Sequence, residues 1–217
     1  MTAPDRDVRG WAGPAAGVTF IAGAASAAAR ASDPYPRPWA TVPEVQRYFT
    51  NNRAAARTSV TGQLLSAAAL SVFSTAVVKA SAHDPTRARA AHAAGALAAA
   101  SLATSATCNV LLTTTQGRDP DTARRLHRWG FAAGGPVHTV TFGALVGTLS
   151  IDASGPGAPG RALQTASLMA AVTGVLSPLY YLARPFGFLI VASRLIGLGA
   201  IAATGVRLAT GNRPIHD

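Results

Sequence analysis

Arg194 is the residue of this sequence best suited to bind a ligand, because it lies within an otherwise apolar run. It stands in VASRLIGLGA, residues 191–200, and the longer stretch 186–206 holds no other charged residue. A guanidinium stays protonated in proteins and can hold a carboxylate or phosphate through two parallel hydrogen bonds. The sequence therefore leaves two interpretations of Arg194: a snorkelling or helix-bridging arginine that binds no ligand, and an arginine that binds an external anion.

Further polar residues lie inside apolar runs and could share a site with Arg194: His138, Thr104, Ser105 and Asn109. If the runs are helices, Arg194 and His138 lie roughly 12–14 Å from the starts of their runs, at 1.5 Å per residue. Thr104 and Ser105 lie at a similar depth from the same side, because their run has the opposite direction. We therefore predict that Arg194, His138, Thr104 and Ser105 form one polar layer. Asn109 is a further candidate acceptor for Arg194 at the same ligand-binding site. For His138 alone, a satisfied interhelical hydrogen bond is the simpler alternative.

The distribution of acidic residues limits the chemistry of such a layer. All nine Asp and Glu residues fall in gaps between the apolar runs. Proton-coupled transporters usually need a carboxylate inside the membrane, and Mg²⁺ prefers carboxylate ligands. Cys108 is the only cysteine, and the chain has no G-x-S-x-G, H-E-x-x-H or P-loop motif. We expect no catalytic residue, no metal ligand and no cofactor.

The polar layer requires long helices to position it. Only 13% of the residues are charged, against about 25% in a typical soluble domain. The apolar segments span about 10–30, 58–80, 88–113, 129–151, 162–183 and 186–208. Each is near the ~20 residues that a helix needs to cross a bilayer. The sequence predicts an all-α, polytopic integral membrane bundle of about six transmembrane helices, forming a single membrane domain over 1–217. A soluble alanine-rich bundle is the alternative, but such a bundle needs a polar face on every surface helix.

The connection 31–57 contains signals for a short amphipathic helix near 43–53. Thr41, Pro43 and Glu44 provide a cap, a proline start and an acidic first turn. We expect this helix to lie at the membrane surface, with packing on the end of the bundle as the alternative. The small residues at 29–31 also allow segment 10–30 to be a cleaved signal peptide.

The net charge of +10 is scattered over short connections, and no nucleic-acid-binding motif is present. We therefore expect no nucleic-acid partner; the lipid bilayer, with its anionic lipids, is the expected partner. Two glycine pairs at i, i+4 spacing, Gly13 with Gly17 and Gly143 with Gly147, indicate close helix contacts within the chain. The same spacing also allows a helix-mediated homo- or hetero-oligomer.

The bias toward arginine and alanine, with Lys79 as the only lysine, is typical of a high-GC bacterial genome. Together with the six apolar segments, this bias leads us to expect a multi-pass protein of the cell membrane, in a bacterial inner membrane. The favoured function is a binding or accessory role, with the polar layer holding an anionic lipid or amphiphile. A small-molecule transporter or permease that uses the same layer is the alternative. A membrane-embedded enzyme is the least favoured class.

Overall fold

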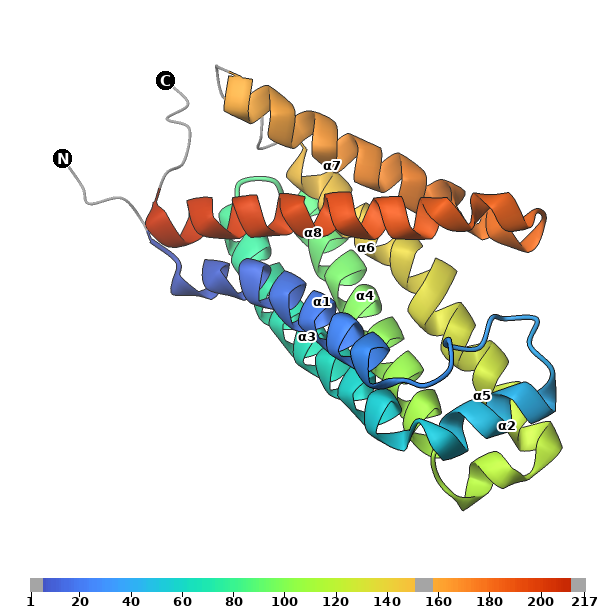
Figure 1. The fold of residues 1–217 in the computed structure, drawn as a ribbon. Coiled ribbons are helices and arrows are strands. Elements are labelled where there is room, and N and C mark those ends of the chain that lie inside the picture. The colour runs from blue at the N-terminus through green and yellow to red at the C-terminus, as the bar shows by residue number, and fades with distance from the viewer. Residues whose placement is uncertain (1–5, 151–157, 212–217) are drawn as a thin grey trace.

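The computed structural model describes residues 6–150 and 158–211, and all regular secondary structure in these ranges is helical (Figure 1). The longer helices are α1 (Ala12–Arg30), α2 (Val42–Asn51), α3 (Arg53–Ala80), α4 (Pro85–Leu112), α5 (Pro120–Ala132), α6 (His138–Leu149), α7 (Ala158–Leu176) and α8 (Gly187–Thr210). Short helical turns join them: η1 (Val8–Trp11), η2 (Thr115–Arg118), η3 (Ala133–Val137), η4 (Ser177–Tyr181) and η5 (Arg184–Phe186). The prediction of an all-α fold is confirmed.

Five helical stretches among the described residues are long and apolar enough to cross a membrane. They are Val8–Arg30, Arg53–Ala80, Pro85–Leu112, Pro159–Tyr181 and Arg184–Thr210. These stretches overlap five of the six apolar segments predicted from the sequence. The chain is therefore compatible, by length and composition, with a helical membrane protein.

The remaining segment, predicted at 129–151, is not one straight helix. It runs from the end of α5 through η3 into α6, and Gly135 has non-helical backbone angles, φ −99° and ψ −109°. Pro136 follows and has no N–H to donate, which explains a sharp kink at this point. Just after the kink, the Thr139 hydroxyl donates to the Gly135 carbonyl at 2.7 Å. Residue 151 lies outside the described residues.

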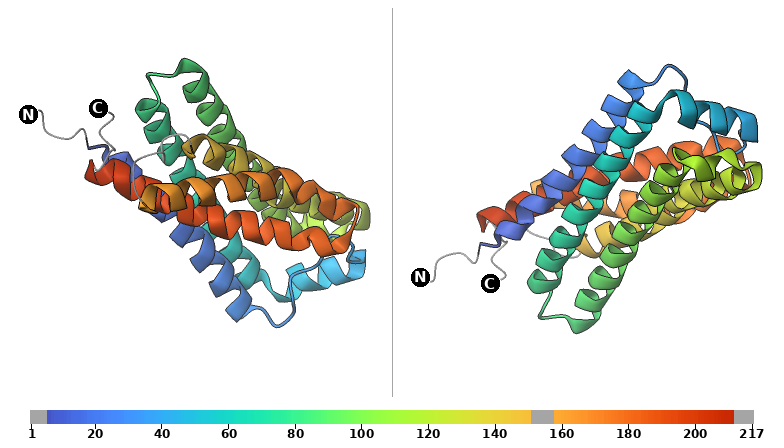
Figure 2. Two further views of the ribbon diagram at one scale, coloured as in Figure 1. Left: turned by 90° about the horizontal axis from the view of Figure 1, so that it is seen from above. Right: turned by 90° about the horizontal axis from the view of Figure 1, so that it is seen from below.

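The described chain runs back and forth between the two ends of the bundle, and α1 packs beside both α3 and α8 (Figures 1 and 2). The backbone N–H of Asp7 donates to the carbonyl of Leu208 at 3.0 Å. The start of η1 and the end of α8 therefore lie at the same end of the bundle. The kinked α5–α6 segment provides the return path between the end of α4 and the start of α7 (Figure 1).

Glycines allow the closest helix contacts. A Cβ added at Gly23 of α1 would lie 2.6 Å from the Cα of Gly62 in α3, so the two backbones touch. A Cβ at Gly143 would lie 3.3 Å from the Cα of Gly174 in α7, and one at Gly13 would collide with the carbonyl of Ile201. The glycine positions predicted to pack helices therefore make contacts within the chain.

The short helix expected at 43–53 is present as α2. The backbone N–H of Thr41 donates to the Glu44 carboxylate at 2.7 Å, which completes its capping box. Val45 and Phe49 are fully buried, in a cluster that includes Leu112 of α4. The apolar face of α2 thus packs on the end of the bundle, as in the alternative drawn from the sequence.

Candidate functional site

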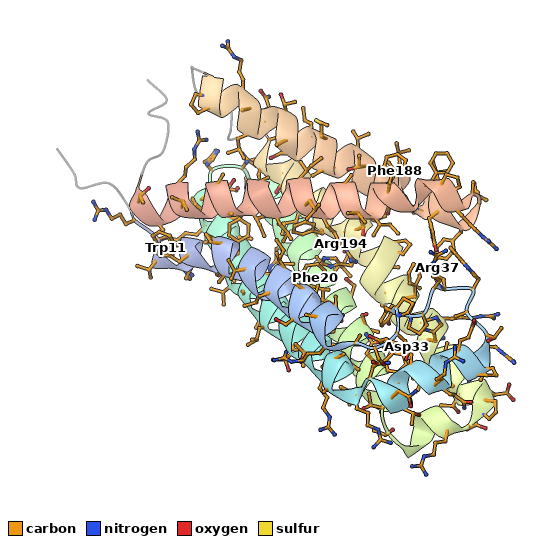
Figure 3. The ribbon with its side chains drawn as sticks, viewed as in Figure 1. Trp11, Phe20, Asp33, Arg37, Phe188 and Arg194 are labelled. Carbon is orange, nitrogen blue, oxygen red and sulfur yellow. The ribbon has the colours of Figure 1, made fainter. Side chains whose placement is uncertain are left out.

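Arg194 lies where four helices converge, with its side chain between α8 and α1 (Figure 3). A small cavity beside it has a volume of about 10 Å³, close to the least space that one water molecule needs. Its lining comes from α1, α3, α6 and α8: Ala16, Phe20, Ser66, Leu70, His138, Phe142, Arg194, Leu198 and Ile201. Most of this wall is apolar, so the guanidinium is the dominant polar group of the cavity.

The guanidinium of Arg194 has unused donors. Nε and Nη2 are both buried and have no hydrogen-bond partner within the protein. The guanidinium carbon lies 5.3 Å from the ring centroid of Phe20. This cation–π contact offsets part of the cost of burying the charge. Nε and Nη2 lie on the same side of the planar group, and this edge matches the two oxygens of a carboxylate. Arg194 can therefore accept an external anion without losing an internal bond.

His138 is the second polar group of the cavity, and its tautomer follows from its partners. Nδ1 lies 3.0 Å from the carbonyl oxygen of Ala98, which can only accept, so Nδ1 carries the proton. The Ser101 hydroxyl lies 3.3 Å from the same nitrogen. The ring stacks on Phe142 with centroids 5.4 Å apart. In this neutral form Nε2 keeps a lone pair, so His138 adds an acceptor to the donors of Arg194.

The other predicted members of the polar layer lie elsewhere. Thr104 is exposed and its hydroxyl donates to the Ala100 carbonyl at 2.9 Å, within its own helix. Ser105 is buried against η3, where a Cβ added at Gly134 would collide with its hydroxyl. Of the five predicted residues, Arg194 and His138 line one cavity.

Asn109 belongs to a second cavity of about 410 Å³ at the end of the bundle. Its side-chain oxygen accepts a hydrogen bond from the hydroxyl of Tyr35 at 3.0 Å. Burial raises the pKa of Tyr35, which keeps the phenol a neutral donor. Asp33 and Ser59 also line this cavity. The sequence of α4 did not indicate that Tyr35, from the proline-rich connection after α1, would bond to Asn109.

The sequence also gave no signal for Phe20 and Ser66 at the Arg194 cavity. Phe20 is an ordinary apolar residue of its span, and only the crossing of α1 with α8 brings it to the guanidinium. The Ser66 hydroxyl donates to the Ala16 carbonyl at 2.9 Å and fixes α3 to α1 beside the cavity. Among the described residues, no group of three or more His, Cys, Asp or Glu side chains could hold a metal ion.

Comparisons of the chain with protein-family models, with curated proteins and with solved structures found no match.

Proposed function

We propose that this chain is a six-pass protein of a bacterial inner membrane that binds the anionic end of an amphiphile at Arg194. One observation carries the proposal: the buried Nε and Nη2 of Arg194 lack partners in the protein. A charged side chain inside hydrocarbon costs at least ~2.5–3.5 kcal/mol on the insertion scale, and such residues usually mark functional sites. An external anion would offset this cost by accepting two charge-assisted hydrogen bonds.

A lipid environment is supported by the outer faces of the last two long helices. Large apolar side chains are exposed along α7 and α8: Leu168, Met169, Val172, Val175, Leu176, Phe188, Val191, Leu195 and Val206. Exposure of so many large apolar side chains is unfavourable in water and suits hydrocarbon. The lipid would therefore meet α8 on the side opposite the bundle.

Six passes are proposed because both described chain ends meet at one end of the bundle, through the Asp7–Leu208 hydrogen bond. An even number of passes places the ends of η1 and α8 on the same side of the membrane. The kinked stretch from Trp129 to Leu149 would then be the fourth pass, despite its break at Gly135. In this arrangement α2 and the start of α5 lie at the headgroup level.

The favoured ligand is a carboxylate-bearing amphiphile, such as a fatty acid. Its two oxygens match the Nε–Nη2 edge of Arg194, and its chain would leave the bundle between α1 and α8. The cavity of about 10 Å³ has room for about one water molecule, so the carboxylate would bind only if the cavity walls move apart. A cavity of this size favours a binding role over the passage of a solute, and so favours an accessory protein over a permease.

Mass spectrometry of amphiphiles extracted from the purified protein tests the site. Arg194→Gln should lower the molar ratio of bound fatty acid at least several-fold relative to the wild-type protein. Arg207→Gln, in the last turn of the same helix, is the matched control and should keep the wild-type ratio. Equal amphiphile content in all three proteins would rule out binding at Arg194.

The topology has a separate test. The protein should stay in the membrane pellet after an alkaline carbonate wash, and tags at the two chain ends should be accessible from the same side. Tags on opposite sides would indicate an odd number of passes and overturn the six-pass arrangement. Release of the protein into the aqueous wash would contradict membrane insertion itself.

A further inference from the structure

A wide groove opens at the end of the bundle opposite the Asp7–Leu208 contact, separate from the Arg194 cavity. Its volume is about 660 Å³, and it lies between the loop after α1, the end of α5 and the turns η4 and η5. The residues around it are Pro38, Trp39, Arg128, Trp129, Phe131, Ala132, Tyr180, Tyr181, Leu182, Ala183 and Arg184. Three segments that are distant in the sequence therefore build one surface feature.

Five of the eleven residues that line the groove are aromatic. The ring of Tyr180 lies 5.9 Å from Trp39 and 5.6 Å from Phe131, centroid to centroid. Tyr181 continues the row at 6.1 Å from Tyr180. Trp129 is 68% exposed at the edge. Tryptophan and tyrosine favour the headgroup level of a membrane, because one end of each ring is polar.

The charge of the groove is cationic. Arg184 stacks over Trp39, with its guanidinium carbon 4.4 Å from the ring centroid, and Arg128 is also exposed at the lining. None of the described residues that line the groove is acidic. Arg37 also lies near Trp39, with its guanidinium carbon 5.8 Å from the ring centroid, but it lines the neighbouring cavity together with Asp33 and Glu44. Arg128 and Arg184 are therefore the cations that belong to the groove.

The apolar surface next to the groove indicates what kind of anion would fit. Leu182 is 82% exposed at the groove, and Phe188, in the first turn of α8, is 62% exposed. Val175 and Leu176 at the end of α7 are exposed as well. A ligand that meets all these groups has an anionic head at the arginines and apolar chains along α7 and α8. A phospholipid of the surrounding bilayer has this form.

We propose that this aromatic–arginine groove is a binding site for one anionic phospholipid, whose headgroup phosphate is held by Arg128 and Arg184. The aromatic rings pack against the glycerol region, and the acyl chains follow the outer face of α7 and α8. The site is distinct from the one proposed at Arg194, since the two share no lining residue. The groove would fix the depth of η4 and η5 in the membrane.

Tryptophan fluorescence can test the groove directly. The chain has three tryptophans, and Trp11 lies outside the groove, so a Trp11→Phe background leaves only Trp39 and Trp129, both at the lining. The protein is reconstituted in phosphatidylcholine vesicles with a fixed fraction of either brominated phosphatidylglycerol or brominated phosphatidylcholine. Brominated phosphatidylglycerol should quench the fluorescence more strongly. The double variant Arg128→Gln/Arg184→Gln should lose this preference, by about fivefold for each arginine removed, the equivalent of ~1 kcal/mol.

The matched control is Arg53→Gln/Arg57→Gln, which removes two exposed arginines from the first turns of α3, at the same end of the bundle. It should retain the preference for phosphatidylglycerol, as should Arg194→Gln. Equal quenching by both brominated lipids in the parent protein would overturn the proposal. An equal loss of preference in both double variants would also overturn it, because it would show diffuse surface attraction in place of a site.

Discussion

Arg87 and Arg194 both place a guanidinium inside the bundle, at different depths and with different partners. Arg87 is only 6% exposed, and its Nε and Nη2 donate to the Thr148 carbonyl at 3.0 and 2.6 Å. The same two nitrogens of Arg194 have no partner in the protein. The side chains are chemically identical, so their surroundings account for the difference.

Helix ends explain the contrast. Arg87 stands in the first turn of α4, beside the last turn of α6, where carbonyls have no partner within their own helix. Arg194 faces the first half of α1, the middle of α3 and the start of α6, and its Nε and Nη2 bond to none of their backbone carbonyls. A buried arginine near a helix end can thus be satisfied by the fold, whereas one at mid-helix needs a side chain or a ligand.

The largest effect is expected from removal of the satisfied arginine. Arg87→Met deletes two charge-assisted hydrogen bonds to the Thr148 carbonyl and should lower the free energy of unfolding by about 1.5–3 kcal/mol. In a chain of this size, that corresponds to a melting temperature lower by roughly 3–12 °C. Thermal unfolding in detergent, followed by near-ultraviolet circular dichroism, measures the change. Arg89→Met, at an exposed position two residues further on, should leave the melting temperature nearly unchanged; an equal drop would contradict the role given to Arg87.

A smaller effect is expected at the contact that positions α1 beside Arg194. Gly23→Ala places a methyl group 2.6 Å from the Cα of Gly62, so the backbones of α1 and α3 must move apart. We expect a loss of about 1–2 kcal/mol, within the range for overpacking, and reduced amphiphile retention because Phe20 moves with α1. Gly199→Ala in α8, which meets nothing within 4 Å, is the control for both measurements. If Gly23→Ala retained as much amphiphile as the wild-type protein, binding at Arg194 would not depend on the close packing of α1 against α3.

The smallest expected effect is the pH dependence of stability that comes from His127, in α5. His127 Nε2 donates to the Arg37 carbonyl at 2.9 Å, Nδ1 has no partner, and burial lowers the pKa of the ring. The unfolded chain binds the proton at about pH 6.5, above the pKa of the folded protein. Stability from His127 is therefore full above about pH 6.5 and declines as the pH falls toward the lower pKa.

His127→Gln retains a donor for the Arg37 carbonyl but cannot titrate. Melting temperatures at pH 7.5 and pH 5 should differ less in this variant than in the wild-type protein. An identical pH dependence in both proteins would show that His127 is not the group responsible.

Apolar segment length and helix-start signals predicted the long helices, α2 and the position of Arg194 along its helix. Each of these depends on residues close together in the sequence. The positions of Thr104 and Asn109 depend on the rotation of α4, which small alanine side chains do not indicate. The kink at Gly135 could have been expected from Pro136, whereas the approach of Phe20 to Arg194 depends on how α1 and α8 cross. The position of a residue along its helix is thus easier to predict from sequence than the direction in which its side chain points.

The most direct test of the account is the stability of Arg194→Leu measured with and without the bound amphiphile. An unpartnered buried charge destabilises a fold, and an apolar replacement of similar size is often neutral or stabilising. After exhaustive removal of amphiphiles, we therefore predict that Arg194→Leu melts at the same temperature as the wild-type protein or above it. With fatty acid restored, the wild-type protein should become the more stable of the two. A variant that is less stable by the same amount in both conditions would show that the fold itself satisfies Arg194, and would contradict the proposed site.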